Sequence, residues 1–378
     1  MELAIAGQRP VNADLAVGLP GATHKPIAQV RRIVRTVGPE TGLIDDREFR
    51  NCHVVDFDGH TYIVSHRAIL TVVVVSVCNA GCKFCSNEIT FTPAGRFLAW
   101  NERLRRIKDF ALVSGIGKIA YTGGEPTLNP QALLDLTTAM NPGFVKSRLH
   151  TNGFGLFKPV HAAGNQRELL PALIDAGLTG VSISIAHFDP EANREIMRLP
   201  KSWTGMQPDA LRAIAETASP RFTPRLSCVM TAEGVNDVPT VFEYMRWGKS
   251  LGFRRFIFRT CSEIQPGYKK ATDFTTYNDE NRMSVDVLAE KLSRHDDVEL
   301  IYRQRKSDSK VDVYRSGDIV FDIDESSEEE DPDEKIRRLI MMPNGAAYSS
   351  WIDPLSVLFD DDLATARQSM AVEFAATR

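Results

Sequence analysis

Three cysteines lie close together in the stretch VSVCNAGCKFCSNE, directly after a run of valines. Cys78, Cys82 and Cys85 have the spacing C-x3-C-x2-C and are half of the six cysteines in the chain. A structural zinc ion normally has four nitrogen or sulfur ligands, and neither His66 nor Glu88 stands at a usual zinc spacing from the three. A disulfide bond would leave one cysteine over. A [4Fe-4S] cluster held by three cysteines leaves one iron open to a small chelating ligand, and three unrelated core cysteines are the remaining alternative.

The cysteines follow the run TVVVVSV, residues 71–77, which is rich in β-branched residues. A continuous run of this kind is typical of a strand that is buried on both faces of a parallel sheet. The helical stretch RFLAWNERLRRIKDFALVSG and the strand-like KIAYT come next, and the alternation continues to RRFIFRT, giving six strand and helix units. This pattern predicts a parallel sheet with right-handed crossovers, either doubly wound or curled into a full or partial barrel.

The segments on both sides of this repeat have a different pattern. Residues 1–70 contain a possible helix, KPIAQVRRIVRTV, and a hairpin candidate in which CHVVDF and HTYIVS flank Asp58 and Gly59. Residues 263–378 contain a possible helix, SVDVLAEKLSR, and strand-like pieces with Gly-Asp and Asn-Gly turns. We therefore expect an α/β fold, a partial (β/α)6 TIM-like barrel over residues 71–262 with an N-terminal lead-in element and a C-terminal α/β extension.

The charge of the chain limits the classes of partner. Its 378 residues include 45 basic and 49 acidic ones, and the formal charge of −4 gives no reason to expect a nucleic-acid or membrane surface. Many of the acidic residues gather in DIDESSEEEDPDEK within the extension. We interpret residues 322–334 as a solvated or disordered acidic loop, in preference to a site that recruits a basic partner.

The N-terminal sequence MELAIAGQRPVNADL has no basic segment followed by an apolar one, as a secretory signal would have. No apolar run approaches the roughly 20 residues needed to cross a bilayer. Six cysteines are too few for a disulfide scaffold in a chain of this size. We therefore expect a cytoplasmic protein, in a reducing compartment where thiols stay free to bind metal.

The segment CNAGCKFC resembles the signature of the radical S-adenosylmethionine (radical SAM) superfamily, C-x3-C-x-aromatic-C, with Phe84 at the aromatic position. The resemblance extends over about residues 70–262, as judged from the strand and helix alternation. It implies that the three cysteines hold a [4Fe-4S] cluster and that S-adenosylmethionine chelates its open iron.

Two strand ends further along the chain resemble motifs of the same family. TGGEP ends the second strand and is similar to the GGE motif, which implies that Gly123, Gly124 and Glu125 hold the amino group of the methionine moiety. HTNG ends the third strand and is similar to the T-N-G of many members, which implies that Asn152 offers its amide near the cofactor. A turn asparagine before glycine is the alternative for Asn152.

The fourth and fifth strands offer further candidates. SISIAHFDPEANREI resembles the S-L-D-x-x-D-P-E stretch of members such as the first enzyme of molybdenum-cofactor synthesis. Ser184 matches the serine that approaches the carboxylate of the cofactor, but Ala186 replaces the aspartate, and His187 has no assigned role. In PRLSCVMTAEGVND, Arg225 is a candidate carboxylate clamp, with an ordinary surface arginine as the alternative.

The resemblance also implies a mechanism. One electron from the cluster cleaves S-adenosylmethionine into methionine and a 5′-deoxyadenosyl radical, which takes a hydrogen atom from a C–H bond of the substrate. An electron donor such as flavodoxin or ferredoxin would supply the electron. Cys261 ends the sixth strand and could return a hydrogen atom to a substrate radical, although a small buried hydrophobe is the alternative. Cys228 is a weaker candidate, and Cys52 is expected to be structural.

These features leave three functional hypotheses. The leading one is an enzyme with a single cluster that epimerises, dehydrogenates or rearranges a small molecule, such as a sugar or natural-product intermediate, since no cysteine follows Cys261 to hold an auxiliary cluster. The second is modification of a peptide, with Arg31, Arg32 and Arg35 holding an acidic leader. The third is a metal-binding or redox-sensing protein without catalysis, for which the intact GGEP would have no use.

Overall fold

The computed structural model describes residues 52–85, 102–203, 205–264, 273–305, 309–328, 336–351 and 356–359. Arg31, Arg32 and Arg35 and the helix predicted at KPIAQVRRIVRTV lie outside these residues. Within them, no helix is both long enough and apolar enough to cross a bilayer.

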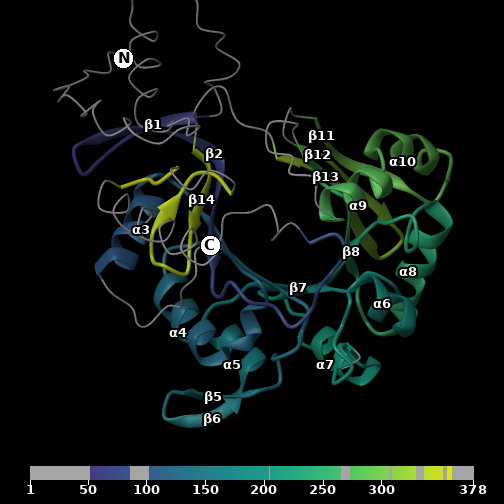
Figure 1. The fold of residues 1–378 in the computed structure, drawn as a ribbon, viewed down its shortest axis with the longest axis horizontal. Coiled ribbons are helices and arrows are strands. Elements are labelled where there is room, and N and C mark those ends of the chain that lie inside the picture. Colours follow the sequence, from purple (N-terminus) through teal and green to yellow (C-terminus); the bar gives the residue numbers. More distant parts are fainter. Residues whose placement is uncertain are drawn as a thin grey trace, which may run out of the picture.

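The six predicted strands form the centre of one parallel sheet, so the predicted α/β fold class is confirmed. In Figure 1 this sheet follows an open arc with helices outside it. Its central strands, in spatial order, are β2 (His60–Val73), β3 (Lys118–Thr122), β4 (Lys146–Thr151), β7 (Gly180–Ser184), β8 (Thr223–Val229) and β9 (Arg255–Arg259).

The C-terminal extension adds a parallel strand to each side of this centre, which the sequence pattern did not predict. The strand β13 (Ile319–Glu328) pairs with β9, and β14 (Ile336–Met341) pairs with β2. The two strands follow one another in the chain but lie at opposite ends of the parallel array. The extension is therefore part of the main sheet.

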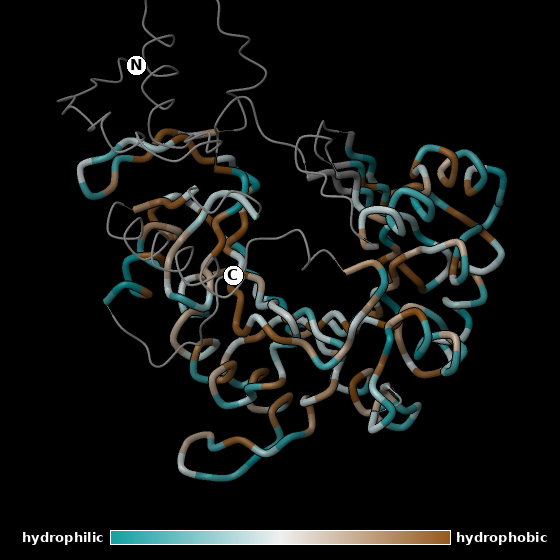
Figure 2. Tube along the Cα trace, viewed as in Figure 1, coloured by the Kyte–Doolittle hydropathy of each residue, from teal (hydrophilic) through white to brown (hydrophobic). Residues whose placement is uncertain are grey.

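The helices that connect the central strands lie outside the arc (Figure 1). Hydrophobic residues recur along the strands (Figure 2), and many of them belong to the main core cluster. The packing between helix and strand is close at Gly248, because a Cβ atom added there would lie 2.4 Å from the ring of Phe256. These helices are α3 (Glu102–Val113), η3 (Pro126–Leu128), α4 (Pro130–Met140), α5 (Leu169–Asp175), α6 (Pro190–Ile196), α7 (Pro208–Glu216) and α8 (Val238–Ser250).

The N-terminal hairpin is present and continues into the sheet. The strand β1 (Cys52–Phe57) pairs with the first half of β2 around Asp58 and Gly59, as the Asp-Gly signal predicts. The same β2 then forms the first parallel strand, so the proposed domain boundary after residue 70 lies within a continuous strand. A second hairpin, β5 (Pro159–Ala162) with β6 (Asn165–Glu168), precedes α5. The sequence pattern predicted no element at β5 and predicted the start of a helix, QRELLPALIDAG, where most of β6 lies.

The other elements of the extension agree closely with the turn signals. Gly317 and Gly345 have positive φ values of 59° and 80°, at the Gly-Asp and Asn-Gly turns. The helix α9 was not predicted. The remaining elements of the extension are β10 (Glu263–Ile264), α9 (Asp273–Asn281), α10 (Val285–Leu292), β11 (Glu299–Arg305), β12 (Ser309–Ser316) and β15 (Ala347–Tyr348).

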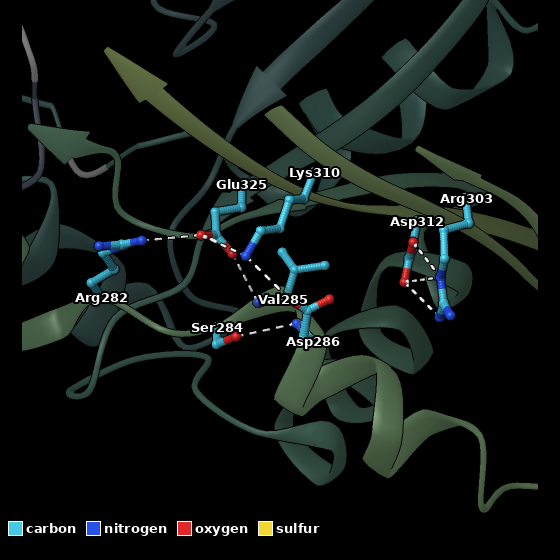
Figure 3. A network of polar contacts seen from close by, with 8 residues as sticks. All are labelled: Arg282, Ser284, Val285, Asp286, Arg303, Lys310, Asp312 and Glu325. Carbon is cyan, nitrogen blue, oxygen red and sulfur yellow. Dashed lines mark hydrogen bonds and ion pairs between the residues drawn. The ribbon is translucent and has the colours of Figure 1, made fainter. Parts of the chain in front are cut away.

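The prediction of an acidic loop at 322–334 is wrong for its first half, because β13 extends through residue 328. Residues 329–335 lie outside the described part of the chain. The reason is that the acidic side chains of β13 find cationic partners. Glu325 accepts hydrogen bonds from the backbone N–H of Val285 at 3.0 Å and from Arg282 at 3.1 Å, and Lys310 lies 3.6 Å away (Figure 3).

The neighbouring strand β12 carries a second buried carboxylate, which is paired with Arg303 beside the Glu325 group (Figure 3). Asp312 is 0% exposed and accepts hydrogen bonds from the guanidinium of Arg303 at 3.0 Å and from the hydroxyl of Tyr314 at 2.9 Å. Buried carboxylates with such partners hold neighbouring elements in a fixed arrangement. The two carboxylates therefore help to fasten α10 and the antiparallel strands to the main sheet.

Candidate functional site

The cysteine loop, residues 78–85, leaves the C-terminal end of the first parallel strand. Cys78 is exposed, whereas Cys82 and Cys85 are half-buried. The backbone N–H of Ala80 donates to the sulfur of Cys78 at 3.4 Å, and that of Cys85 donates to the carbonyl of Cys82 at 3.1 Å. The loop is thus compact, with its three thiols within eight residues.

The loop rests on the chain that follows the fourth predicted strand. The N–H groups of Gly81 and Lys83 donate to the carbonyls of Arg198 and Ile196 at 3.4 and 3.2 Å. Phe84 packs with Cys82 and Ala80 against a small apolar cluster, so the aromatic position serves packing in this arrangement. The buried members of this cluster are Ala186, Ile196, Met197 and Leu199.

The three thiols influence one another electrostatically. Burial raises the pKa of Cys78, and the negative charges of Glu125 and Cys85 raise it further. Burial also raises the pKa of Cys82, followed in effect by the charges of Cys85 and Cys78. Within the described residues, no three His, Cys, Asp or Glu side chains already have a metal-binding geometry. Thiolates this close together repel one another, and a bound cationic centre would relieve that repulsion.

The two glycines of TGGEP allow the strand end to contact the chain that leads to the cysteines. Gly124 N–H donates to the carbonyl of Val75 at 2.8 Å, and Glu125 N–H donates to that of Val77 at 2.9 Å. A Cβ atom at Gly124 would lie 2.0 Å from the Val77 oxygen, and one at Gly123, where φ is +148°, would lie 2.3 Å from the Val75 oxygen. Only glycine permits this approach. The resemblance implied that the glycines hold a ligand. In the structure they also allow this close contact between two backbone segments.

Glu125 is 1% exposed and its carboxylate accepts four hydrogen bonds from the protein. The donors are the N–H and hydroxyl of Thr127 at 2.9 and 2.5 Å, the hydroxyl of Thr151 at 2.6 Å and the N–H of Asn152 at 2.7 Å. Burial raises the pKa of Glu125, and the hydrogen bonds oppose that shift. Three of the four bonds reach Oε1, so Oε2 has the capacity for one further donor.

Asn152 connects the third strand end to the cysteine loop. Its Nδ2 donates to Oδ1 of Asn79 at 2.9 Å, and its own Oδ1 accepts from the N–H of Phe154 at 3.0 Å. Asn79 Nδ2 is buried and has no hydrogen-bond partner among the described residues. A buried donor without a partner is costly unless a bound group accepts from it. The three thiols, the close glycine contacts and this free donor therefore fit an iron-sulfur cluster with a polar ligand.

Two residues that the sequence did not single out also hold the cysteine loop. Lys83 Nζ lies 2.8 Å from the carboxylate of Glu233, and the hydroxyl of Tyr277 donates to the same carboxylate at 2.7 Å. Glu233 follows the fifth parallel strand and Tyr277 belongs to α9 of the extension. No local pattern could pair residues so far apart in the chain.

Ser184 and Arg225 lie near one another on adjacent strands. Ser184 is half-buried and stands in register with Ser227, whereas Arg225 stands in register with Ser182, two residues earlier along the strand. The Nε of Arg225 donates to the hydroxyl of Ser182 at 2.5 Å. Arg225 is thus an inward-facing residue of the sheet, and the surface alternative is excluded by its exposure of 16%.

The remaining candidates are placed as follows. Cys261 is 1% exposed, with its sulfur 3.7 Å from the carbonyl of Met230, and burial raises its pKa to about 12. Cys228 is 0% exposed. These positions favour the structural interpretation of both thiols. His187 accepts a hydrogen bond from the N–H of Asp189 at 2.9 Å and so supports the turn that precedes α6.

The parallel sheet and its clustered strand-end motifs define a class of protein. The family described as "Radical SAM superfamily" matches residues 72–244, from β2 to α8. This part of the chain belongs to the radical SAM superfamily, a superfamily of enzymes. Membership implies a [4Fe-4S] cluster and S-adenosylmethionine as cofactors, and a reductant.

The chain is similar over shorter stretches to curated proteins of that superfamily. It is 34% identical over 131 residues to a GTP 3′,8-cyclase of Vibrio cholerae, which is 34% of this chain and 36% of the relative. It is 30% identical over 186 residues to a GTP 3′,8-cyclase of Chlorobaculum tepidum, 46% of this chain and 49% of the relative. The chain thus spans less than half the length of these relatives.

The similarity of the chain to solved structures is weaker. Streptococcus suis SuiB bound to the precursor peptide SuiA has a TM-score of 0.47 and 13% identity, covering 76% of this chain and 60% of that one. Coproporphyrinogen III oxidase (HemN) from Escherichia coli has a TM-score of 0.38 and 13% identity, covering 60% of this chain and 52% of that one. Values this low support no argument about the substrate.

Proposed function

We propose that the protein is a radical SAM enzyme with a single cluster that acts on a small molecule by epimerisation, dehydrogenation or rearrangement. The observation that supports this proposal best is the convergence of three motifs. Gly124 and Glu125 bond to the chain that leads into the cysteine loop, and Asn152 bonds to Asn79 within that loop. A metal-binding protein without a polar cofactor would not need these strand ends to meet.

In this proposal Cys78, Cys82 and Cys85 hold the [4Fe-4S] cluster through their sulfur atoms. With S-adenosylmethionine bound, the cluster supplies a 5′-deoxyadenosyl radical that can take a hydrogen atom from an unactivated C–H bond. Burial of Cys82 against the apolar cluster of Ala186, Ile196, Met197 and Leu199 excludes water from one side of the site. The Lys83 and Glu233 pair holds the loop on its other side.

The cofactor would be positioned by groups that already lie at the strand ends. Glu125 Oε2 can accept one more hydrogen bond, which suits an ammonium group, while Asn79 Nδ2 can donate one. Ser184 is proposed to approach the carboxylate of the cofactor, and Arg225 is proposed to bind the same carboxylate. These assignments for Gly123, Gly124, Glu125, Asn152, Ser184, Arg225 and Phe84 extend the resemblance to the family and are open to test.

The proposed partners are a small-molecule substrate and an electron donor such as flavodoxin or ferredoxin. The names of the relatives suggest GTP as one substrate to examine. A cytoplasmic location is proposed because a reducing compartment keeps the three thiols free. The division into residues 1–70, 71–262 and 263–378 also stays a proposal, although strands from the first and last parts join the central sheet.

The proposal is tested by anaerobic reconstitution of the full chain with iron and sulfide, followed by an assay for 5′-deoxyadenosine in the presence of a strong reductant. We expect iron to bind and the nucleoside to form. The variant Cys82→Ala should lose both, whereas Cys228→Ala, at a buried thiol outside the loop, should retain iron. Protein that binds one zinc and no iron, or iron-loaded protein that forms no 5′-deoxyadenosine, would support the metal-binding or sensing alternative.

A further inference from the structure

Three arginines lie on the inward face of the curved sheet, on three of its parallel strands. Arg148 belongs to β4, Arg225 to β8 and Arg259 to β9. Side chains alternate between the two faces of a strand. The strand neighbours of the arginines, Leu149, Leu226 and Phe258, are 0% exposed and belong to the core on the outer face, which places the arginines on the other side.

These guanidinium groups have few partners in the described part of the chain. Arg225 Nε donates to the Ser182 hydroxyl at 2.5 Å, and an outer nitrogen of Arg148 donates to the Thr223 carbonyl at 3.4 Å. A guanidinium has five N–H donors, so most of the donors of these two groups make no bond to the residues that the structure describes.

The nearest carboxylates come from β13 and stand slightly too far away for hydrogen bonds. Asp322 lies 3.8 Å from an outer nitrogen of Arg225, and Asp324 lies 3.6 Å from Nε of Arg259. These distances allow attraction between the charges but exceed those of good N–H···O bonds. Three cations therefore face two carboxylates without direct bonds. The charge of Arg255 also lowers the pKa of Arg148 and of Asp322, so it adds to the excess of positive charge.

The arginines also repel one another. Burial lowers the pKa of Arg225 to about 9, with further lowering by the charges of Arg148 and Arg259. Burial and the same three arginines hold the pKa of His150, on the same face, well below its usual value. Cations placed together in a partly desolvated region are costly unless an anion binds among them.

The sheet makes room for this arrangement at Gly180, which stands in register with Arg148. A Cβ atom at Gly180 would lie 2.9 Å from an outer nitrogen of Arg148 and 2.8 Å from the Thr223 carbonyl oxygen. The absence of a side chain on β7 thus lets the guanidinium lie over the neighbouring strand, which is a second and independent feature of the same site.

We propose that Arg148, Arg225 and Arg259 form an anion-binding site inside the curved sheet and that the substrate carries a carboxylate or phosphate group which binds there. This inference rests on the proposed function and narrows its substrate class, and it assigns Arg225 to the substrate in place of the cofactor carboxylate. The site shares the inward face of β7 with Ser184, because Ser182 and Ser184 are two residues apart on that strand. Arg148 and Arg225 are in register with Gly180 and Ser182, which precede Ser184 on β7, whereas Arg259 is the last residue of β9. The anionic group would therefore bind between the middle of the sheet and its C-terminal edge.

The test is protection of arginines from phenylglyoxal in the anaerobically reconstituted full chain, mapped by mass spectrometry. The probes are pyrophosphate and citrate, each added with and without S-adenosylmethionine. We expect either probe to slow modification of Arg148, Arg225 and Arg259 by at least about 10-fold, both without and with S-adenosylmethionine. Arg246 and Arg294, whose side chains are 74% and 71% exposed, are internal controls and should react equally in all samples.

Two results would overturn the inference. One is equal modification of the three arginines with and without the probes. The other is protection by S-adenosylmethionine alone with no added protection by either probe, which would assign the arginines to the cofactor carboxylate. Iron content and 5′-deoxyadenosine formation, measured on the same preparation, report separately on the proposed function.

A binding measurement gives a second readout. Calorimetric titration with pyrophosphate should show about 10- to 100-fold weaker binding in Arg225→Gln than in the wild type, because a charge-assisted bond is lost. Arg225→Lys should recover part of the loss, and Arg246→Met should bind as the wild type does. Unchanged binding in a folded Arg225→Gln protein would contradict the inference.

Discussion

The carboxylate of Glu125 accepts a hydrogen bond of 2.7 Å from the backbone N–H of Asn152, so the second and third parallel strands are joined at their C-terminal ends. The Thr151 hydroxyl strengthens this link with a bond of 2.6 Å to the other carboxylate oxygen. In turn, Asn152 donates to Asn79 in the cysteine loop. The acidic residue of the GGE motif therefore organises the site through the protein itself as well as through any ligand.

Replacement of Glu125 by glutamine should destabilise the fold. A glutamine side chain has one acceptor oxygen, and its NH₂ group would face the donors that now bond to the carboxylate. Leaving buried donors unsatisfied costs about 1–3 kcal/mol in the free energy of unfolding, which urea denaturation would measure. The matched control is Glu191→Gln, whose side chain is 72% exposed. Equal midpoints for the two variants would show that the network around Glu125 does not carry this free energy.

Replacement of Gly124 by alanine should disturb the cysteine loop. The added Cβ atom would lie 2.0 Å from the Val77 oxygen and 2.8 Å from the nitrogen of Cys78, and both are backbone atoms that can move only with the loop. We expect iron incorporation on reconstitution to fall by at least about half, with a stability loss of about 1–3 kcal/mol. Gly117→Ala is the control, because its nearest contact would be an ordinary 3.8 Å to Val145. Full iron incorporation in Gly124→Ala would mean that the backbone contact is dispensable.

The sequence predicts the central sheet well for a physical reason. KIAYT coincides with β3, and α4 follows it as the alternation of strands and helices predicts. A short buried strand and an amphipathic helix flanked by proline and asparagine leave local signals. The partners of β13 and β14 could not be predicted. Which edge of a sheet a strand joins depends on packing between distant segments, and local pattern carries no information about it.

The candidate site likewise has a part that the sequence predicted and a part that it did not. Its motifs were predicted to lie at the ends of neighbouring strands, and the structure brings the cysteine loop, TGGEP and HTNG into contact. The contact between Lys83 and Glu233 joins residues 150 positions apart. The hydrogen bond from Tyr277 to Glu233 joins the C-terminal extension, residues 263–378, to the central part of the chain, residues 71–262. Such contacts depend on the docking of whole elements, so no local pattern in the sequence indicated them.

Loss of the charge on Glu325 should loosen the extension. This carboxylate is 7% exposed and lies beside Arg282, Lys310 and the N–H of Val285 (Figure 3). Breaking a buried pair leaves uncompensated groups, so we expect Glu325→Gln to lose about 1–3 kcal/mol by urea denaturation. The control is Glu290→Gln, an exposed pair with Arg294 for which about 0.3–0.5 kcal/mol is typical. A loss as small as that of the control would contradict the structural role of Glu325.

The thiols should differ in reactivity in the protein without metal. Cys78 is exposed, whereas Cys228 and Cys261 are buried. Burial raises the pKa of all three thiols, but only the two buried ones are also shielded from a reagent. Because the reagent must reach the thiolate, iodoacetamide should label Cys78 at least about 10-fold faster than Cys261, as followed by peptide mass spectrometry. In urea the difference should vanish. Rapid labelling of Cys261 in the folded protein would instead support its candidacy as a hydrogen-atom donor.

The stability of the protein should fall in mild acid because of His150. Burial and the charges of Arg259, Arg225 and Arg148 lower the pKa of this side chain well below its unfolded value of 6.5. The unfolded chain therefore binds a proton that the folded chain does not, and the folded state loses up to about 1.4 kcal/mol per pH unit as the pH falls below 6.5. We expect His150→Gln to show a flatter fall in urea midpoint than the wild type between about pH 7 and pH 5. His161→Gln, at an exposed histidine of the β5 and β6 hairpin, is the matched substitution control. His150→Gln differs from the wild type at this one side chain, so the difference between their slopes reports on His150. Identical slopes would mean that His150 does not titrate differently in the folded and unfolded states, and the inward face would then be less cationic than the positions of its arginines indicate.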